Sequence, residues 1–195
     1  MATKEDILEQ LVEEFLIHRG YFVRHNVKFL PSKDHKDFVT NQDSNHSDID
    51  VLGYNPLLEA SDRVWAVSCK SWQSGFNPKA KIIEIEEDKT VNGRKAWKAF
   101  RELASPKWAE GFNAAIKTTT GQSNFTYVTA VTKLIGDGRQ WETYPRFSQA
   151  MAGNPIKLIT LQEMLQKVYG QLSNTLAGTE IGRMLQLIRA AGIRF

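Results

Sequence analysis

Two short segments, residues 47–53 and 64–70, constrain the fold of this chain more than any other feature of its sequence. Both have the alternating pattern of β-strands, in which every second side chain shares a face. Asp48 and Asp50 are therefore expected on one face of the first strand, and Lys70 at the end of the second. If the strands pair, a carboxylate and an ammonium lie close together at the edge of an apolar sheet. This arrangement suits metal-assisted cleavage of a phosphodiester bond.

The same alternation assigns the other side chains of the two segments. Ile49 and Val51 are expected on the face opposite Asp50, and Ser68 on the same face as Lys70. The opposite face of the second strand is expected to carry Trp65, Val67 and Cys69. The single cysteine is thus interpreted as a small buried apolar residue rather than a nucleophile.

Helix and strand patterns alternate along the rest of the chain. Apolar residues at helical spacing predict a first helix over 4–19, which Gly20 is placed to end. Strands are further expected at 21–30, 125–135 and 156–160, and helices at 78–85, 95–104, 106–115, 161–172 and 180–190. This order predicts α/β layers around one mixed sheet, in a single domain over 1–195. Its core covers about 4–170, followed by a C-terminal helical extension over about 171–195.

Composition limits the environment and the partners of the chain. One cysteine excludes an internal disulfide and a multi-cysteine zinc site. No apolar run approaches the roughly 20 residues of a membrane span, and the first residues lack the pattern of a secretion signal, so we expect a cytoplasmic protein. Residues 1–62 hold 6 Lys and Arg against 12 Asp and Glu, whereas residues 63–195 hold 19 against 10. The acidic part is rich in possible metal ligands, and the basic part suits a polyanion.

The ordered motifs of residues 5–72 resemble the PD-(D/E)XK nucleases, and most closely their Mrr-type and Holliday-junction-resolvase-like branch. The resemblance is carried by a first helix with glutamates, then Gly20-Tyr21-Phe22-Val23, Asp50-Val51-Leu52-Gly53 and Val67-Ser68-Cys69-Lys70. It implies a three-layer αβα fold of the restriction-endonuclease type with a central mixed β-sheet. It also implies hydrolysis of DNA by an endonuclease that uses Mg²⁺ or Mn²⁺, and many members act as homodimers.

Motif positions of the family can be transferred to this chain one by one. The metal-binding aspartate falls on Asp50, with Asp48 as a neighbour that could help, and the lysine falls on Lys70. The glutamate of the first helix falls on Glu9, with Glu13 as the alternative. Lys70 is expected to orient or activate the attacking water or to stabilise the phosphorane.

Ser68 departs from the family pattern, because a second acid is expected two residues before the lysine. One interpretation is a catalytically inactive DNA-binding or assembly module that keeps the fold. The other is that the acid has moved, as in restriction enzymes that have Ser-x-Lys and take a glutamate from the next helix. Glu84 follows Lys70 with 13 residues between them and is the preferred candidate, with Glu86 and Glu87 as substitutes.

Contacts to DNA are expected from the basic stretch over 89–108. Arg94, Lys98 and Arg101 are spaced i, i+4 and i+7 and would form one stripe of the helix expected at 95–104, which suits phosphate contacts or a solvated face. Two histidines, His35 and His46, lie in a polar loop over 31–47 and have no cysteine at zinc-ligand spacing, so a solvated or DNA-facing role is expected. The apolar side of the last helix, Ile181, Met184, Leu185 and Ile188, would pack on a partner or close the core. A third interpretation is an unrelated α/β protein with a chance motif.

Overall fold

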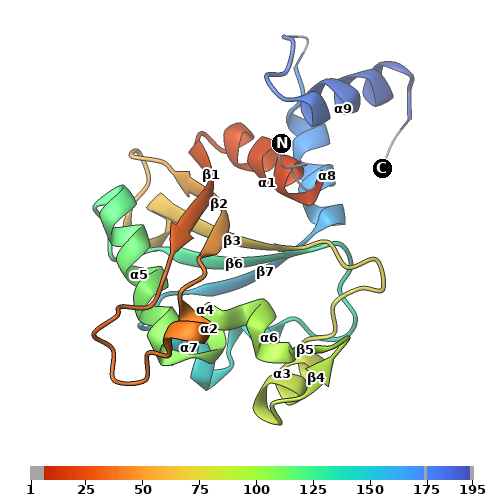
Figure 1. The fold of residues 1–195 in the computed structure, drawn as a ribbon. Coiled ribbons are helices and arrows are strands. Elements are labelled where there is room, and N and C mark those ends of the chain that lie inside the picture. The colour runs from red at the N-terminus through yellow and green to blue at the C-terminus, as the bar shows by residue number, and fades with distance from the viewer. Residues whose placement is uncertain (1–6, 174, 194–195) are drawn as a thin grey trace.

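A five-stranded mixed sheet forms the centre of the computed structural model, which describes residues 7–173 and 175–193 (Figure 1). The strand order is β1-β2-β3-β6-β7, with antiparallel pairs up to β3 and parallel pairs from β3 onward. The strands are β1 Phe22–Phe29, β2 Ser47–Tyr54, β3 Val64–Lys70, β6 Thr126–Val131 and β7 Ile156–Thr160. The strands expected at 21–30 and 156–160 are confirmed, and the one expected at 125–135 is shorter than its apolar pattern.

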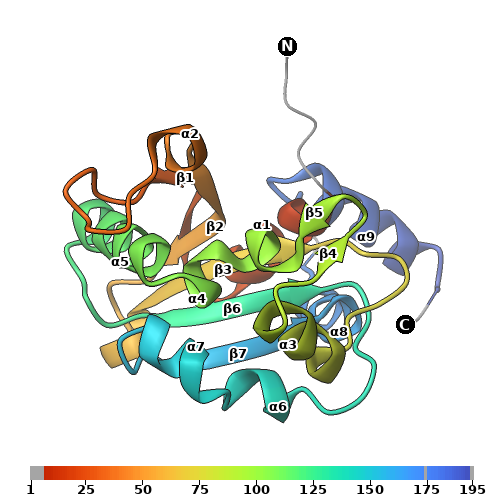
Figure 2. The same cartoon turned by 60° about the horizontal axis from the view of Figure 1, so that its bottom comes forward.

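Helices cover both faces of this sheet, so the predicted three-layer αβα architecture is confirmed (Figures 1 and 2). On one face lie α1 Ile7–His18, α8 Leu161–Gln171 and α9 Glu180–Ala190. On the other face lie α3 Pro78–Glu86, α4 Arg101–Ala104, α5 Pro106–Thr120, α6 Arg139–Glu142 and α7 Pro145–Ala150. Each face has its own hydrophobic core, and the interior strand β6, between β3 and β7, is buried along its whole length.

The first helix ends where the sequence predicts. Gly20 has a φ of 80°, and its N–H and that of Tyr21 bond to the Ile17 and Leu16 carbonyls at 2.9 and 3.0 Å. Only glycine adopts this left-handed conformation readily, which is why it closes the helix. The expected first residues of this helix, 4–6, lie outside the described residues.

Strand β2 does not alternate as the sequence predicts. Ile49 belongs to the core beneath α5, together with Val27, whereas Val51 belongs to the core beneath α1. The prediction that Ile49 and Val51 share a face is therefore wrong. The break lies at Asp50, opposite the position on β1 where Asn26 has a φ of 53°, between the registered pairs His25–Val51 and Val27–Ile49.

A second correction concerns the helix expected at 95–104. A short hairpin comes first, with β4 Thr90–Val91 and β5 Arg94–Lys95 joined by Asn92 and Gly93, whose φ values are 49° and 77°. An Asn-Gly pair with both φ positive is the favoured two-residue hairpin turn. A 3₁₀ helix, Ala96–Phe100, follows and leads into α4. The stripe of cations on one continuous helix is therefore wrong, although Phe100 is buried in the core as its apolar character indicates.

Short helices that the sequence patterns did not indicate fill the connections. They are α2 Thr40–Asp43, inside the expected polar loop, and the helices α6 and α7 after β6. The longer helices agree with expectation, since α3, α8 and α9 match their predicted segments closely and α5 continues beyond residue 115. Among the described residues, no helix is long and apolar enough to cross a bilayer.

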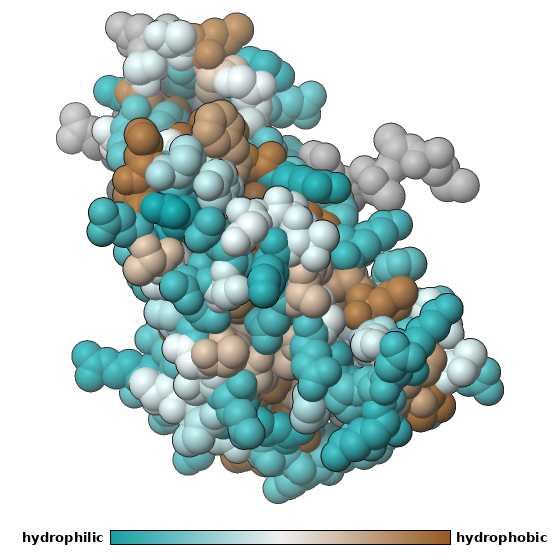
Figure 3. Space-filling view, turned by 90° about the vertical axis from the view of Figure 1, so that its left-hand side faces the viewer, coloured by the Kyte–Doolittle hydropathy of each residue, from teal (hydrophilic) through white to brown (hydrophobic). Residues whose placement is uncertain are grey.

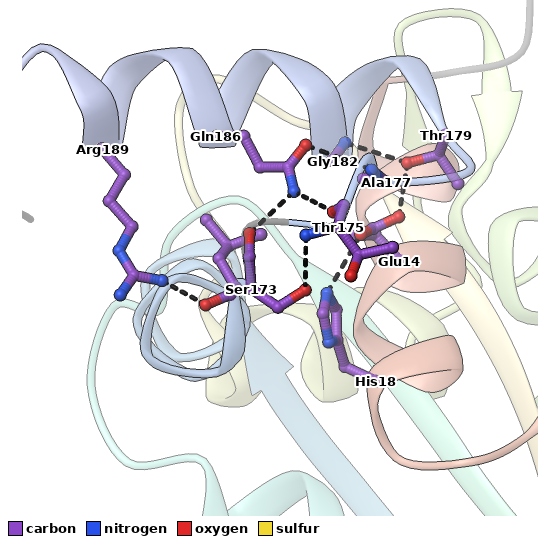
Figure 4. A network of polar contacts seen from close by, with 10 residues as sticks. Glu14, His18, Ser173, Thr175, Ala177, Thr179, Gly182, Gln186 and Arg189 are labelled. Carbon is purple, nitrogen blue, oxygen red and sulfur yellow. Dashed lines mark hydrogen bonds and ion pairs between the residues drawn. The ribbon is translucent and has the colours of Figure 1, made fainter.

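Helix α9 is fastened to α1 by a buried carboxylate (Figure 4). Glu14 accepts a hydrogen bond from the Thr179 hydroxyl and contacts His18 Nε2 at 3.1 Å, while Thr179 Oγ1 caps α9 through the Gly182 N–H at 2.9 Å. A Cβ at Gly182 would collide with the Glu14 carboxylate, which explains the glycine. Leu185 of α9 is buried in the α1 core, so this helix closes the core rather than standing free.

The outer surface is mostly polar. Seen from the side of β1 and α5, hydrophilic side chains dominate and apolar ones form small patches between them (Figure 3). Such scattered apolar exposure is normal for a folded chain.

Candidate active site

A polar recess of about 290 Å³ lies where β2 and β3 part. The registered pairs between the two strands end at Val51–Val67, so Asp50 and Ser68 lie just beyond the last pair. The recess is lined by His46, Ser47, Asp48, Asp50, Ser68, Lys70, Lys98, Ala99, Arg101 and Glu102. The geometric prediction that Asp50, Ser68 and Lys70 share one face is thus confirmed, and Asp48 lies exposed beside them.

Asp50 is held in place by the neighbouring strand. Its Oδ2 accepts a hydrogen bond of 2.6 Å from the Cys69 backbone N–H. Because β2 and β3 separate here, the Cys69 N–H bonds to the Asp50 carboxylate instead of to a backbone carbonyl of β2. Cys69 itself points away from the recess and packs against the α1 core, as the alternation along β3 predicts.

Lys70 enters the recess from the end of β3. Its Nζ lies 5.2 Å from the centre of the Phe100 ring, a distance at which the ring face attracts a cation. Within the described part of the chain, no carboxylate oxygen lies within 4.0 Å of this ammonium. The side chain is half-buried, so the charge is positioned by its surroundings and remains available for an anionic ligand.

Besides Asp50 and the exposed Asp48, the recess has a third acid, Glu102, at the start of α4. Its side chain is 6% exposed, and its Oε1 accepts a hydrogen bond of 2.6 Å from the Tyr127 hydroxyl. Burial raises the pKa of the Glu102 carboxyl, and the Asp50 charge raises it further, whereas the Lys70 charge and the Tyr127 hydroxyl oppose this rise without cancelling it. Glu102 is therefore an acid whose negative charge is incompletely compensated.

A buried polar layer supports this carboxylate from below. Tyr127 is fully buried on β6, and burial together with the Glu102 charge places the pKa of its hydroxyl well above the usual range, so it stays a donor. Trp141 Nε1 donates a hydrogen bond of 2.9 Å to Thr129 Oγ1 in the same strand. Ser68 is buried beside the Tyr127 hydroxyl.

Glu84, the expected second acid, lies elsewhere. It pairs with Lys81 at 2.7 Å and lines a neighbouring cleft instead of the recess. Its proposed substitutes are also engaged at the surface, Glu86 with Arg146 at 2.8 Å and Glu87 with Lys89 at 2.7 Å. The spacing from Lys70 does not bring Glu84 to Asp50, because Glu84 lines the cleft together with residues of the 3₁₀ helix and is absent from the recess. The structure therefore brings Glu102, and not Glu84, into the recess with Asp50.

Glu9 does not line the recess either. Helix α1 packs on the opposite face of the sheet, where Glu9 is half-buried, and Glu13 lies 3.2 Å from His25 Nε2. The expected supporting role of Glu9 at the recess is not supported by this position.

The expected DNA-binding cations are divided between two places. Lys98 and Arg101 line the recess, and together with Arg94 they also line the adjoining cleft. Of the two loop histidines, His46 lies exposed at the recess, whereas His35 Nε2 lies 3.7 Å from Glu110. The sequence placed these cations near each other but gave them the wrong secondary structure.

The donor set bears on the expected metal ion. Among residues 7–173 and 175–193, no group of three or more His, Cys, Asp and Glu side chains is arranged to hold a metal. Asp50 and Glu102 supply two carboxylates to one recess, and the exposed Asp48 lies at its edge. Mg²⁺ is commonly held by one or two carboxylates, with waters and substrate phosphates completing its shell. The recess therefore fits that class of site and not a fully protein-ligated one.

Comparisons with known proteins add no assignment. No family model, no curated protein and no solved structure matches this chain.

Proposed function

We propose that this protein is a metal-dependent endonuclease of the PD-(D/E)XK type that hydrolyses DNA phosphodiester bonds in the recess between β2 and β3. The observation that carries the proposal is the meeting of Asp50, Lys70 and Glu102, which come from β2, β3 and α4. Two acids and a lysine converging on one polar recess are the groups that this chemistry needs.

Asp50 and Glu102 would hold a Mg²⁺ or Mn²⁺ ion. When bound, such an ion lowers the pKa of a coordinated water and offsets the charge that develops on the phosphate. The raised pKa of Glu102 supports this role, because a buried carboxylate near Asp50 gains most from a neighbouring cation. Binding of the ion is therefore expected to release protons and to weaken as the pH falls.

Lys70 would act on the substrate side. Its ammonium has no carboxylate within 4.0 Å in the described part of the chain, so its donors can reach a phosphate oxygen or the attacking water. A preorganised cation aimed at developing negative charge stabilises the transition state more than the substrate. Tyr127 would keep Glu102 in position by its hydrogen bond to Oε1.

The test is cleavage of supercoiled plasmid with Mg²⁺ or Mn²⁺. We expect nicking by the natural protein, and at least about a 100-fold loss in Asp50→Asn, Lys70→Ala and Glu102→Gln, since the loss of a supporting partner alone costs about 10–100-fold. Glu84→Gln is the matched control, because it removes one carboxylate outside the recess.

The outcomes separate the proposal from its rival. Nicking that survives Asp50→Asn and Lys70→Ala places the activity elsewhere or in a contaminant. Binding of DNA with no nicking at any divalent concentration assigns the chain to the non-catalytic DNA-binding module, for which Ser68 is the specific observation. The expected homodimer stays a prediction, which light scattering with and without DNA tests.

A further inference from the structure

A cleft of about 1210 Å³ adjoins the recess and shares Lys98, Ala99 and Arg101 with it. The β4–β5 hairpin lines this cleft, and residues 72–75 with α3 also contribute to its walls. The volume exceeds the roughly 300–1,000 Å³ of most small-molecule pockets, so an extended ligand fits it better.

The charge of the cleft favours a polyanion. Its lining includes five cations, Lys81, Arg94, Lys95, Lys98 and Arg101, and a single acid, Glu84. Lys81 and Lys95 are neutralised by Glu84 and Asp88. In contrast, Arg94, Lys98 and Arg101 have no ion pair with any carboxylate in the described ranges. The three uncompensated cations extend from the hairpin to the recess.

The hairpin has a defined turn and its own polar contacts, and much of it is exposed. The left-handed Asn92 and Gly93 form its turn, Lys95 Nζ pairs with Asp88 at 2.6 Å, and the Ala96 N–H bonds to the Lys89 carbonyl at 2.8 Å. None of its four strand residues belongs to either buried core. Thr90, Asn92 and Arg94 are exposed. A well-defined element that contributes nothing to the core, yet presents an amide and a guanidinium, is available to a ligand.

We propose that the β4–β5 hairpin enters a groove of duplex DNA and reads base edges with Asn92 and Arg94. The inference rests on the DNA substrate of the proposed function and adds sequence selectivity to it. The major groove, about 12 Å wide, admits a two-stranded β-ribbon, in which Arg pairs with guanine and Asn with adenine. Lys98 and Arg101 then contact the phosphates that lead into the recess.

The experiment is a selection of bound sequences from a random duplex library, performed with the full chain in EDTA so that no cleavage is needed. We expect the natural protein to enrich a short pattern. Asn92→Gly combined with Arg94→Ala should lose that pattern and bind the enriched duplex about tenfold or more weakly. Glycine at position 92 keeps the positive φ, so the turn survives. Arg183→Ala, an exposed arginine on α9, is the matched control for charge.

Each result decides the inference. It is overturned if the double variant enriches the same pattern, if neither protein enriches any, or if single strands bind better than duplex. The proposed nuclease function fails separately, through the plasmid assay. A pattern that the double variant loses, in a protein that does not nick, keeps the hairpin assignment and removes the catalytic one.

Discussion

Two buried carboxylates, Asp43 and Glu102, have pKa values shifted in opposite directions. Asp43 of α2 accepts hydrogen bonds from Lys107 Nζ at 2.6 Å and from the Val39 N–H at 2.8 Å. Burial alone would raise the pKa of Asp43, but these partners bring it below its ordinary value. Glu102 has the Tyr127 hydroxyl and no cation within 4.0 Å in the described ranges, and burial raises its pKa. Asp43 is therefore compensated as a structural acid, whereas the incomplete compensation of Glu102 at a recess is what the proposed function would use.

The largest effect that tests this contrast is expected at Asp43. Asp43→Ala leaves the Lys107 ammonium, only 13% exposed, without its partner, and should lower the free energy of unfolding by about 3–5 kcal/mol. Urea unfolding at pH 7 measures it. Because the folded pKa of Asp43 lies below 3.8, its contribution is present above that pH and is lost as the pH falls through the folded value. A loss below about 1 kcal/mol would mean that the pair is solvated and the contrast with Glu102 is weaker.

The next effect concerns the donor that supports Glu102. Tyr127→Phe removes a hydrogen bond to a charged acceptor and should destabilise the fold by about 1.5–3 kcal/mol. It also removes an influence that lowers the pKa of Glu102, so that pKa rises further. If cleavage needs ionised Glu102, the acidic limb of the plot of kcat/KM against pH shifts to higher pH.

A matched control for this variant is Tyr144→Phe. Tyr144 is half-buried and its hydroxyl interacts with Glu86, outside the recess. Its loss should leave the pH profile unchanged. If the acidic limb of the pH profile does not shift in Tyr127→Phe, Tyr127 has a purely structural role.

The residues of this site that lie on regular strands could be predicted from the sequence, whereas those on short irregular elements could not. Asp50, Ser68 and Lys70 lie within the regular strands β2 and β3, just beyond the last β2–β3 pair, where alternation indicates the face, and their meeting could be predicted. The alternation breaks between Ile49 and Asp50, because the left-handed Asn26 opposite this point on β1 is a property of the paired strands and not of β2 alone.

Glu102 and the hairpin could not be placed in the same way. Glu102 lies in a four-residue helix after a 3₁₀ turn, and which way such a short helix faces depends on tertiary packing. The sequence nevertheless contains a sign of this burial. Glu102 is an acid close to the apolar residues Phe100 and Leu103, and all three side chains are buried. For the hairpin, the Asn92-Gly93 pair is itself a turn signal that the apparent helical spacing concealed.

A smaller effect is expected when the charge of Glu102 is removed. Glu102→Gln keeps an acceptor for Tyr127 and abolishes an unfavourable buried charge, so it should stabilise the fold at pH 7 by about 1 kcal/mol while it abolishes nicking. The sign follows from the raised pKa, since the native state binds the proton more tightly than the unfolded state does. Thermal unfolding across pH measures it, and the gain should vanish below about pH 4.5, the ordinary pKa of this group. If Glu102→Gln were less stable than the natural protein at pH 7, the negative charge of Glu102 would be well compensated, and the contrast with Asp43 would fail.

The smallest effect is expected at Glu84, the acid that spacing alone favours. Its pair with Lys81 is partly solvated, with side chains 22% and 21% exposed, and such pairs contribute about 0–1 kcal/mol. Glu84→Gln should therefore change the free energy of unfolding by less than about 1 kcal/mol and leave the rate of nicking unchanged. Parallel urea unfolding and plasmid assays measure both quantities. A loss of nicking as large as that of Glu102→Gln would mean that α3 closes toward Asp50 when DNA and the metal bind. The spacing of Glu84 from Lys70 would then have predicted the metal ligand correctly.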